Sequence, residues 1–246
     1  VSVRIFALNC ATTRSDIFPM RALLLLQLPL PSASFQSRHQ SSFQSTALRS
    51  IPGPLDTLTS GLASLARLQA GVTVDPNART SVELVELYDM ENNPDCRVIR
   101  ERITELDLTV KVAPSFKNVP RLKLRTEIGQ EVLVSGLKEI MEYLGGETEV
   151  DNLEAIRTVG NYVATALRWG RGSSISPAAI NKVPAKALIL YSYEGNQFCR
   201  LVREVLTELN LPYELRSTGK ESPRRRELSE LTGGYTQCPY LVDPNT

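Results

Sequence analysis

The sequence is short of the residues that carry most acid–base and metal chemistry in proteins. Its 246 residues include one histidine, His39, which lies in a segment we expect to be removed. Without histidine, the mature chain cannot use Ser-His or Cys-His catalytic pairs or a His-rich zinc site. Cysteine is also sparse: Cys10, Cys96, Cys199 and Cys238 are too few for the disulfide framework of a small secreted protein.

The chain also lacks a charge imbalance and a concentration of aromatic residues. Its formal net charge is +1, and aromatic residues make up 6% of the sequence. A near-neutral chain has no strong field to attract nucleic acid, and so few rings cannot form a base-stacking platform. We therefore expect no nucleic-acid partner. The hydrophobic fraction of 42% is ordinary for a globular protein, and the length allows one large domain or two small ones.

The beginning of the chain lacks acidic residues. None occurs between Asp16 and Asp56, and a leucine-rich run broken by two prolines precedes a stretch rich in serine and arginine. The run is too short to cross a bilayer, so we expect no integral membrane span. This composition is typical of an organelle-targeting segment and predicts a leader over residues 1–54. It resembles the two-part leader of plastid proteins in algae with secondary plastids; a mitochondrial leader and a disordered tail are the alternatives.

Residues 55–80 are predicted to form a helix and a linker. Leucine and alanine recur at helical spacing over residues 55–72, which predicts a short amphipathic helix. We expect its apolar face to pack on the core, with contact to a membrane surface as the alternative.

Two segments of the chain follow one pattern. Residues 86–108 and 189–211 align around Cys96 and Cys199, which lie 103 positions apart. The identities at this offset are Tyr88/Tyr191, Glu91/Glu194, Asn93/Asn196, Arg97/Arg200, Arg100-Glu101/Arg203-Glu204 and Thr104-Glu105-Leu106/Thr207-Glu208-Leu209. Identity this dense at one offset predicts a duplication and two units of one architecture.

Each segment has the pattern of a β-α-β unit with a buried parallel strand pair. The predicted strands are 84–88 and 108–112 in the first segment and 187–191 and 211–215 in the second, with a helix beginning near the cysteine of each. The second segment continues with a helix capped by Ser222, started by Pro223 and stopped by Gly233. A strand led by a proline then follows. This order of elements is that of a thioredoxin-like fold.

Both segments resemble the glutaredoxin-like N-terminal domain of glutathione S-transferases. The chain from about residue 55 onward resembles tandem-domain thioredoxin-fold proteins of plants and algae. In that family the first helix opens with a Cys-x-x-Cys or Ser-x-x-Cys motif, which residues 93–96 and 196–199 occupy here. Residues 238–241 occupy the segment that holds the family's cis-proline. Both motifs have asparagine where glutaredoxins place their attacking thiol.

The resemblance implies an α/β fold of two tandem thioredoxin-like domains, over residues 81–146 and 186–246, with a helical linker over 147–185. We expect the first domain to be degraded, because no cis-proline strand is evident and its Glu-Ser pair is replaced near residues 136–137. We expect the second to be truncated at Thr246, before its last strand and helix. The linker helix should pack between the domains through an apolar face of Ile156, Val159, Val163, Leu167 and Trp169.

Cys199 is the candidate catalytic residue. A thiol in the first turn of a helix lies at the positive end of the helix dipole, and Arg200 and Arg203 add positive charge nearby. Such a setting lowers the pKa of a cysteine and makes it reactive. The alternative is a structural thiol buried under the helix. A Cys199–Cys238 redox pair, or a shared metal, is a further hypothesis, and a small residue packed under the loop is its alternative.

The resemblance implies glutathione as the cofactor and places Asn196, Phe198, Cys238 and Pro239 at its site. The amide of Asn196 can donate to a glutathione sulfur, although asparagine is also a preferred helix N-cap. In the family, backbone groups of the residue before the cis-proline hold the cysteinyl part of glutathione, and Cys238 takes that position.

Two functions follow from these observations. The first is a glutathione S-transferase-like protein with a glutathione- or thiol-linked role in an organelle, the plastid or alternatively the mitochondrion. Its partner would be glutathione or a protein thiol, and the sequence does not decide whether it is an enzyme. The second is a non-catalytic thioredoxin-fold scaffold that binds a partner protein. The missing attacking thiols favour the scaffold, and the resemblance and Cys199 favour the first function.

Overall fold

The computed structural model describes most of the chain that follows the predicted leader. The described residues run from 53 to 245 except for 69, 78, 79, 81, 146–151, 178 and 180–183, and side chains are described outside 152–158. All but the last two residues of the leader, and with them Cys10 and His39, lie outside this range. No described helix has the length and hydropathy needed to cross a membrane.

The described elements alternate between helix and strand. The helices are α2 (Pro54–Ala66), α3 (Pro94–Glu105), α4 (Leu137–Tyr143), α5 (Asn152–Leu167), α6 (Gln197–Glu208) and α7 (Arg224–Thr232). The strands are β1 (Glu83–Asp89), β2 (Thr109–Pro114), β3 (Arg121–Arg125), β4 (Glu131–Ser135), β5 (Leu188–Ser192), β6 (Tyr213–Ser217) and β7 (Tyr240–Val242). The four strands and two helices predicted around the cysteines are confirmed to within about two residues.

The described strands form a single sheet in the order β4-β3-β1-β2-β6-β5-β7. The chain has two halves, the first from α2 to α4 and the second from α5 to β7. In the first half, β1 and β2 are parallel and β3 is antiparallel to β1. In the second half, β5 and β6 are parallel and β7 is antiparallel to β5. This mixed α/β arrangement fits a thioredoxin-like fold.

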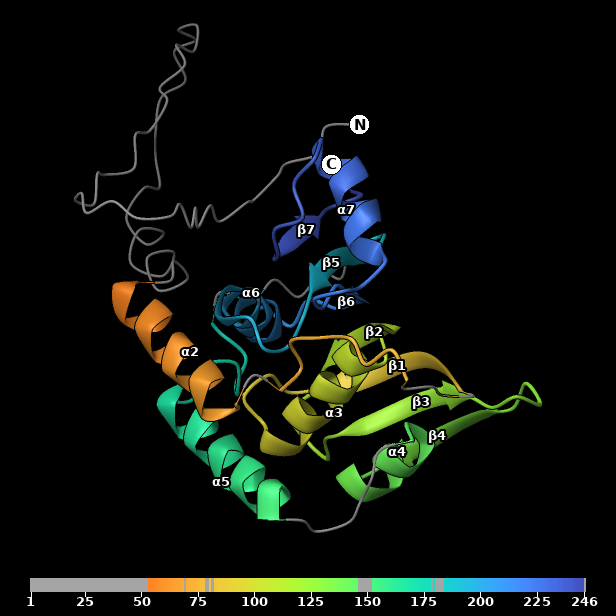
Figure 1. Cartoon of the computed structure of the whole chain (residues 1–246), viewed down its shortest axis with the longest axis horizontal. Coiled ribbons are helices and arrows are strands. Elements are labelled where there is room, and N and C mark those ends of the chain that lie inside the picture. The colour runs from red at the N-terminus through yellow and green to blue at the C-terminus, as the bar shows by residue number, and fades with distance from the viewer. Residues whose placement is uncertain are drawn as a thin grey trace, which may run out of the picture.

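The two halves meet edge to edge in this sheet. Strands β2 and β6 pair antiparallel, with Val110 opposite Leu215 and Val112 opposite Tyr213. All four side chains belong to one buried hydrophobic cluster that runs through both halves. The predicted domains are therefore parts of one continuous sheet with a shared core (Figure 1).

The expectation that the first half has no cis-proline strand is wrong. A cis peptide bond joins Val119 to Pro120, directly before β3, and β4 and α4 follow. The second half carries its cis bond between Cys238 and Pro239, directly before β7. The sequence repeat does not reveal the first cis-proline, because the second half has α7 between its second and third strands and the described residues of the first half have no helix there. The two prolines are therefore 119 positions apart, although the cysteines are 103 apart.

Helices α2 and α5 pack on each other, and each also covers a helix of the opposite half (Figure 1). From α2, the hydroxyl of Ser60 donates to the carbonyl of Gln197 at the start of α6, at 2.8 Å. From α5, the side-chain amide of Asn161 donates to the carbonyl of Pro94 at the start of α3, at 2.6 Å. The segment predicted as a linker thus contributes a helix that matches α2 in position.

The apolar faces predicted for these two helices point away from the core. On α2 the buried residues are Ser60 and Ala63, whereas the leucines are exposed. On α5, Val159, Val163 and the following Trp169 are exposed, at 64%, 45% and 93%, and small or polar side chains are buried instead. The reason is the short distance between the helices. A Cβ atom added at Gly160 would overlap the carbonyl oxygen of Ala66, so only small residues fit between them.

A buried ionic cluster lies where the halves meet. The Nε of Arg100 is 2.9 Å from a carboxylate oxygen of Glu194, and the Nε of Arg203 is 2.9 Å from one of Glu91. Each arginine also contacts the acid of its own half, with Arg203 lying 2.7 Å from Glu194 and Arg100 lying 3.3 Å from Glu91. All four side chains are 1–2% exposed. Losing one member would leave an uncompensated charge in the core.

Candidate functional site

The start of α6 is capped by the side chain of Asn196. Its Oδ1 accepts hydrogen bonds from the backbone N–H groups of Phe198, at 2.8 Å, and Cys199, at 3.0 Å. Asn93 accepts from the N–H of Cys96 in the same way, at 3.0 Å. Both asparagines therefore act as helix N-caps, and both cysteines are the third residue of their helix.

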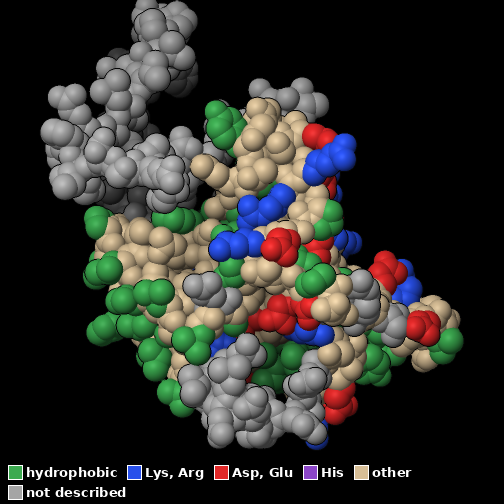
Figure 2. All heavy atoms as spheres, viewed as in Figure 1, with side chains coloured by type: hydrophobic (Ala, Val, Ile, Leu, Met, Phe, Trp, Pro, Cys, Tyr) green, Lys and Arg blue, Asp and Glu red, His purple; other side chains and the backbone are tan. Residues whose placement is uncertain are grey.

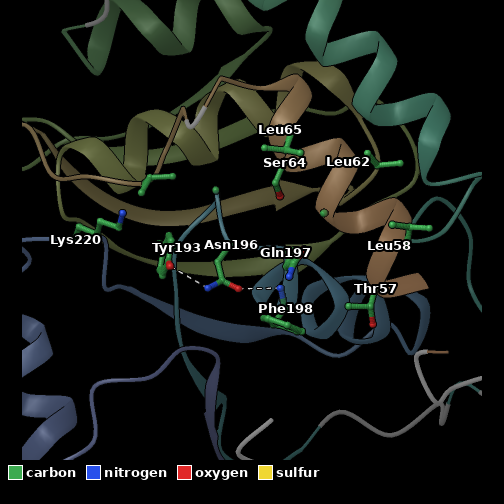
Figure 3. A pocket seen from close by; sticks show the side chains of 13 residues that line it. Thr57, Leu58, Leu62, Ser64, Leu65, Tyr193, Asn196, Gln197, Phe198 and Lys220 are labelled. Atoms are coloured by element: carbon green, nitrogen blue, oxygen red, sulfur yellow. Dashed lines mark hydrogen bonds between the residues drawn. The ribbon is translucent and has the colours of Figure 1, made fainter. Parts of the chain in front are cut away.

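The side-chain amide nitrogen of Asn196 contacts Tyr193, a residue that the sequence alone did not single out. The Nδ2 of Asn196 donates to the hydroxyl oxygen of Tyr193 at 2.9 Å (Figure 3). Because that oxygen already accepts, the hydroxyl proton of Tyr193 is free to be donated. Burial raises the pKa of Tyr193, which keeps the hydroxyl protonated. The first half has Met90 at this position, so the tyrosine is specific to the second half, and that difference is the signal the sequence offered.

Cys199 is completely buried. Burial raises the pKa of its thiol to about 12, and nearby Cys238 raises it further, while Arg203 lowers it less. The charge of Arg203 is engaged by two carboxylates, and Arg200 donates to the carbonyl of Ser60 at 2.9 Å. Burial also raises the pKa of Cys96 well above its usual range. The geometry thus favours a buried structural thiol over an attacking one.

The cis-proline segment lies close to these groups. Cys238 precedes the cis bond to the buried Pro239, and its Sγ is 3.1 Å from the hydroxyl of Thr218. Its charged form would influence both Cys199 and Tyr193, which places the three side chains in one neighbourhood. Both Cys199 and Cys238 are free thiols, and burial raises the pKa of each. No metal-ligand group of three or more side chains occurs among the described residues.

A pocket of about 670 Å³ opens beside the Tyr193–Phe198 loop (Figure 3). Helix α2 of the first half forms its opposite wall. The residues that line it are Thr57, Leu58, Gly61, Leu62, Ser64, Leu65, Val72, Tyr193, Gly195, Asn196, Gln197, Phe198 and Lys220. Two predicted site residues, Asn196 and Phe198, thus face a pocket, whereas Cys199, Cys238 and Pro239 are outside its lining.

Residues 190–246 match the family model of the glutathione S-transferase, N-terminal domain. The matched segment runs from within β5 to the end of the chain and contains α6, the cis-proline and β7. The match agrees with the thioredoxin-like order of elements in the second half. No curated protein and no solved structure gives a significant match to the chain.

Proposed function

We propose that the second half binds glutathione, or a similar cysteinyl thiol, and holds its sulfur with hydroxyl and amide groups. The protein would then be a glutathione S-transferase-like protein that does not attack with a cysteine of its own. The observation that carries this proposal is the Tyr193–Asn196 pair beside the cis Cys238–Pro239 bond, with Cys199 buried beneath.

Tyr193 is the group best suited to hold a ligand sulfur. Its oxygen accepts from Asn196, so its proton can be donated to a thiolate that lies at the start of α6. A hydrogen bond to a charged acceptor is stronger than one between neutral groups, and the positive end of the helix dipole favours the same anion. Together these effects would lower the pKa of the bound thiol and keep it ionised for addition to an electrophile.

The backbone of Cys238 would position the rest of the ligand. Among the described residues, no backbone hydrogen bond outside the strands uses its N–H or its carbonyl. In the family that residues 190–246 match, these groups pair with the cysteinyl part of glutathione. Arg225, whose guanidinium lies 5.6 Å from the ring centre of Tyr193, supplies positive charge for a glutathione carboxylate.

Calorimetric titration with glutathione tests the proposal. We expect Tyr193→Phe to weaken binding about tenfold, because it removes one hydrogen bond to a charged sulfur. Tyr235→Phe is the matched control, since that tyrosine is 68% exposed and outside the pocket lining. Cys199→Ala should bind as the wild type does. Equal affinities for the two tyrosine variants, or loss of binding in Cys199→Ala, would refute the assignment.

The rival function, a scaffold for a partner protein, is favoured by a different observation. Exposed apolar side chains gather on α2 and α5, at the left edge of Figure 2, including Leu55, Leu58, Leu65, Val159 and Tyr162. An apolar surface of this kind is typical of an interaction site. Under the scaffold function the chain would bind no glutathione in the titration above.

We further propose that the halves are copies of one unit that includes the preceding helix. The Nε of Arg67, after α2, lies 2.7 Å from Glu101 of α3, and the Nε of Arg168, after α5, lies 2.6 Å from Glu204 of α6. The two glutamates belong to the sequence repeat, whereas the two arginines lie outside the segments in which the repeat was found. An experimental structure in which α2 and α5 take unlike positions would contradict the proposal.

The location in the cell remains a proposal based on residues 1–54. A leader of this composition should direct a fused fluorescent protein to the plastid, with the mitochondrion as the alternative. Diffuse fluorescence throughout the cytoplasm would contradict both.

A further inference from the structure

The pocket beside Tyr193 has an uneven lining. Its apolar side chains come mainly from α2. Of these, Leu65 extends toward the side of the pocket where Tyr193 and Lys220 lie (Figure 3). Phe198 contributes an aromatic side chain from the start of α6. Among the described residues that line the pocket, Lys220 is the single charged one and none is acidic.

The wall that α2 provides is fixed to the second half by buried hydrogen bonds. The hydroxyl of Ser60 donates to the carbonyl of Gln197, and a guanidinium N–H of Arg200 donates to the carbonyl of Ser60 at 2.9 Å. The first half therefore completes a pocket of the second. The leucines on this wall are held in place although much of their surface is exposed to solvent.

Lys220 is placed at the pocket by its backbone. Its N–H donates to the carbonyl of Val72 at 2.7 Å, and its own carbonyl accepts from Val74 at 3.0 Å. No carboxylate of the described residues forms a salt bridge with its ammonium group. A charge without an opposite partner at the mouth of an apolar pocket is complementary to an anionic ligand.

We propose that this pocket binds a small molecule with an apolar body and one anionic group. The body lies against Leu65 and Phe198, and the anion lies at the ammonium group of Lys220. A pocket of about 670 Å³ is of the size that holds such a molecule. The assignment rests on the proposed function in one respect. The ligand would lie beside Tyr193, which holds the sulfur of glutathione, and would be the second substrate of the transfer.

Two fluorescent dyes with the same ring system test the charge requirement. The anionic dye is 8-anilinonaphthalene-1-sulfonate, and the neutral one is N-phenyl-1-naphthylamine. We expect Lys220→Gln to weaken binding of the anionic dye about fivefold and to change binding of the neutral dye less than twofold. Lys117→Gln is the matched control, because Lys117 is the exposed lysine at the corresponding position of the first half. Equal effects of the two variants would overturn the proposal.

A second pair of variants tests the α2 wall. Leu65→Glu places a carboxylate in the pocket and should weaken the binding of both dyes more than tenfold. Leu55→Glu changes a leucine of the same helix with similar exposure, 72% against 68%, that does not line the pocket. It should leave both affinities within twofold of the wild type. If both variants weaken the dyes alike, or neither does, the dyes bind elsewhere on the apolar surface and the proposal is wrong.

The dye measurements need no glutathione, so they separate this proposal from the previous one. Binding that depends on Lys220 and Leu65 in a protein without affinity for glutathione would support the pocket and refute the proposed function. If glutathione binding depends on Tyr193 but dye binding is unchanged in Lys220→Gln, only the proposal for this pocket is refuted. Circular dichroism of each variant establishes that the fold is intact.

Discussion

Single buried side chains decide much of the behaviour of this molecule. Arg203 contacts Glu91 of the other half and Glu194 of its own, and all three are almost completely buried. Charges in such a place stabilise the fold only as a complete set, because each partner alone would be desolvated without compensation. The same reasoning applies to the buried thiol of Cys199, which the protein keeps neutral.

Removing Arg203 should therefore be costly. We expect Arg203→Met to lower the free energy of unfolding by about 3–5 kcal/mol, since Glu91 and Glu194 then share Arg100 and their buried negative charge is no longer fully compensated. Arg125→Met is the control, because Arg125 is 41% exposed in its ion pairs with Glu83 and Glu131. Its effect should stay below about 1 kcal/mol. Urea unfolding measures both, and similar losses in the two variants would contradict the buried cluster.

The thiol of Cys199 predicts a pH dependence of stability. Its pKa is raised to about 12 in the folded protein, against roughly 8.5 in an unfolded chain. The unfolded thiol therefore ionises first, and the stability that the neutral thiol contributes is present below about pH 8.5 and is lost as pH rises toward 12. Between pH 9 and 10.5, wild-type stability should fall more steeply than that of Cys199→Ala, by up to about 1.4 kcal/mol per pH unit. Urea unfolding across this range would show parallel curves if the thiol were not buried.

The sequence was sufficient to place these residues but not to describe their surroundings. The repeat put Asn196 and Cys199 at the start of a helix, because capping and helix periodicity are local properties. It could not show that the neighbouring Arg203 donates a hydrogen bond to the carboxylate of Glu91, which is 112 positions away. The positive charge of Arg203, which the sequence offered to the thiol of Cys199, is in fact paired with Glu91 and Glu194.

At the scale of elements, α2 and α5 show the limit of helical periodicity. The spacing of leucines on α2 correctly predicted a helix with one apolar face, yet that face is exposed. Periodicity shows which residues share a face and does not show which face is covered. Here the buried faces hold Ser60, Ala63, Asn161 and Ala164, because the helices cross too closely for larger side chains.

The close crossing can be tested at Gly160. A side chain there would overlap the carbonyl oxygen of Ala66, and backbone cannot give way as a flexible side chain does. We expect Gly160→Leu to lower the free energy of unfolding by about 1–3 kcal/mol through overpacking. Ala166→Leu, at an exposed position of the same helix, should have little effect. Thermal unfolding compares the two, and a neutral Gly160→Leu would show that the helices are farther apart.

At the scale of the whole molecule, the two halves depend on each other. The strand pair β2–β6 joins them in one sheet, and the acids and arginines at the join are shared across it. The pocket, likewise, has one wall from each half. A chain of two independent domains joined by an exposed linker would have none of these features.

This dependence predicts that damage in one half destabilises both. Hydrogen exchange should give β1 and β5 the same opening free energy, because both open only when the shared core opens. Arg203→Met, a change in the second half, should lower protection in β1 and β5 by equal amounts. Leu133→Ala, a 53% exposed position on β4, serves as the control and should leave both strands protected as in the wild type. If β1 stays protected while β5 loses protection in Arg203→Met, the halves unfold independently, and the shared core does not couple them.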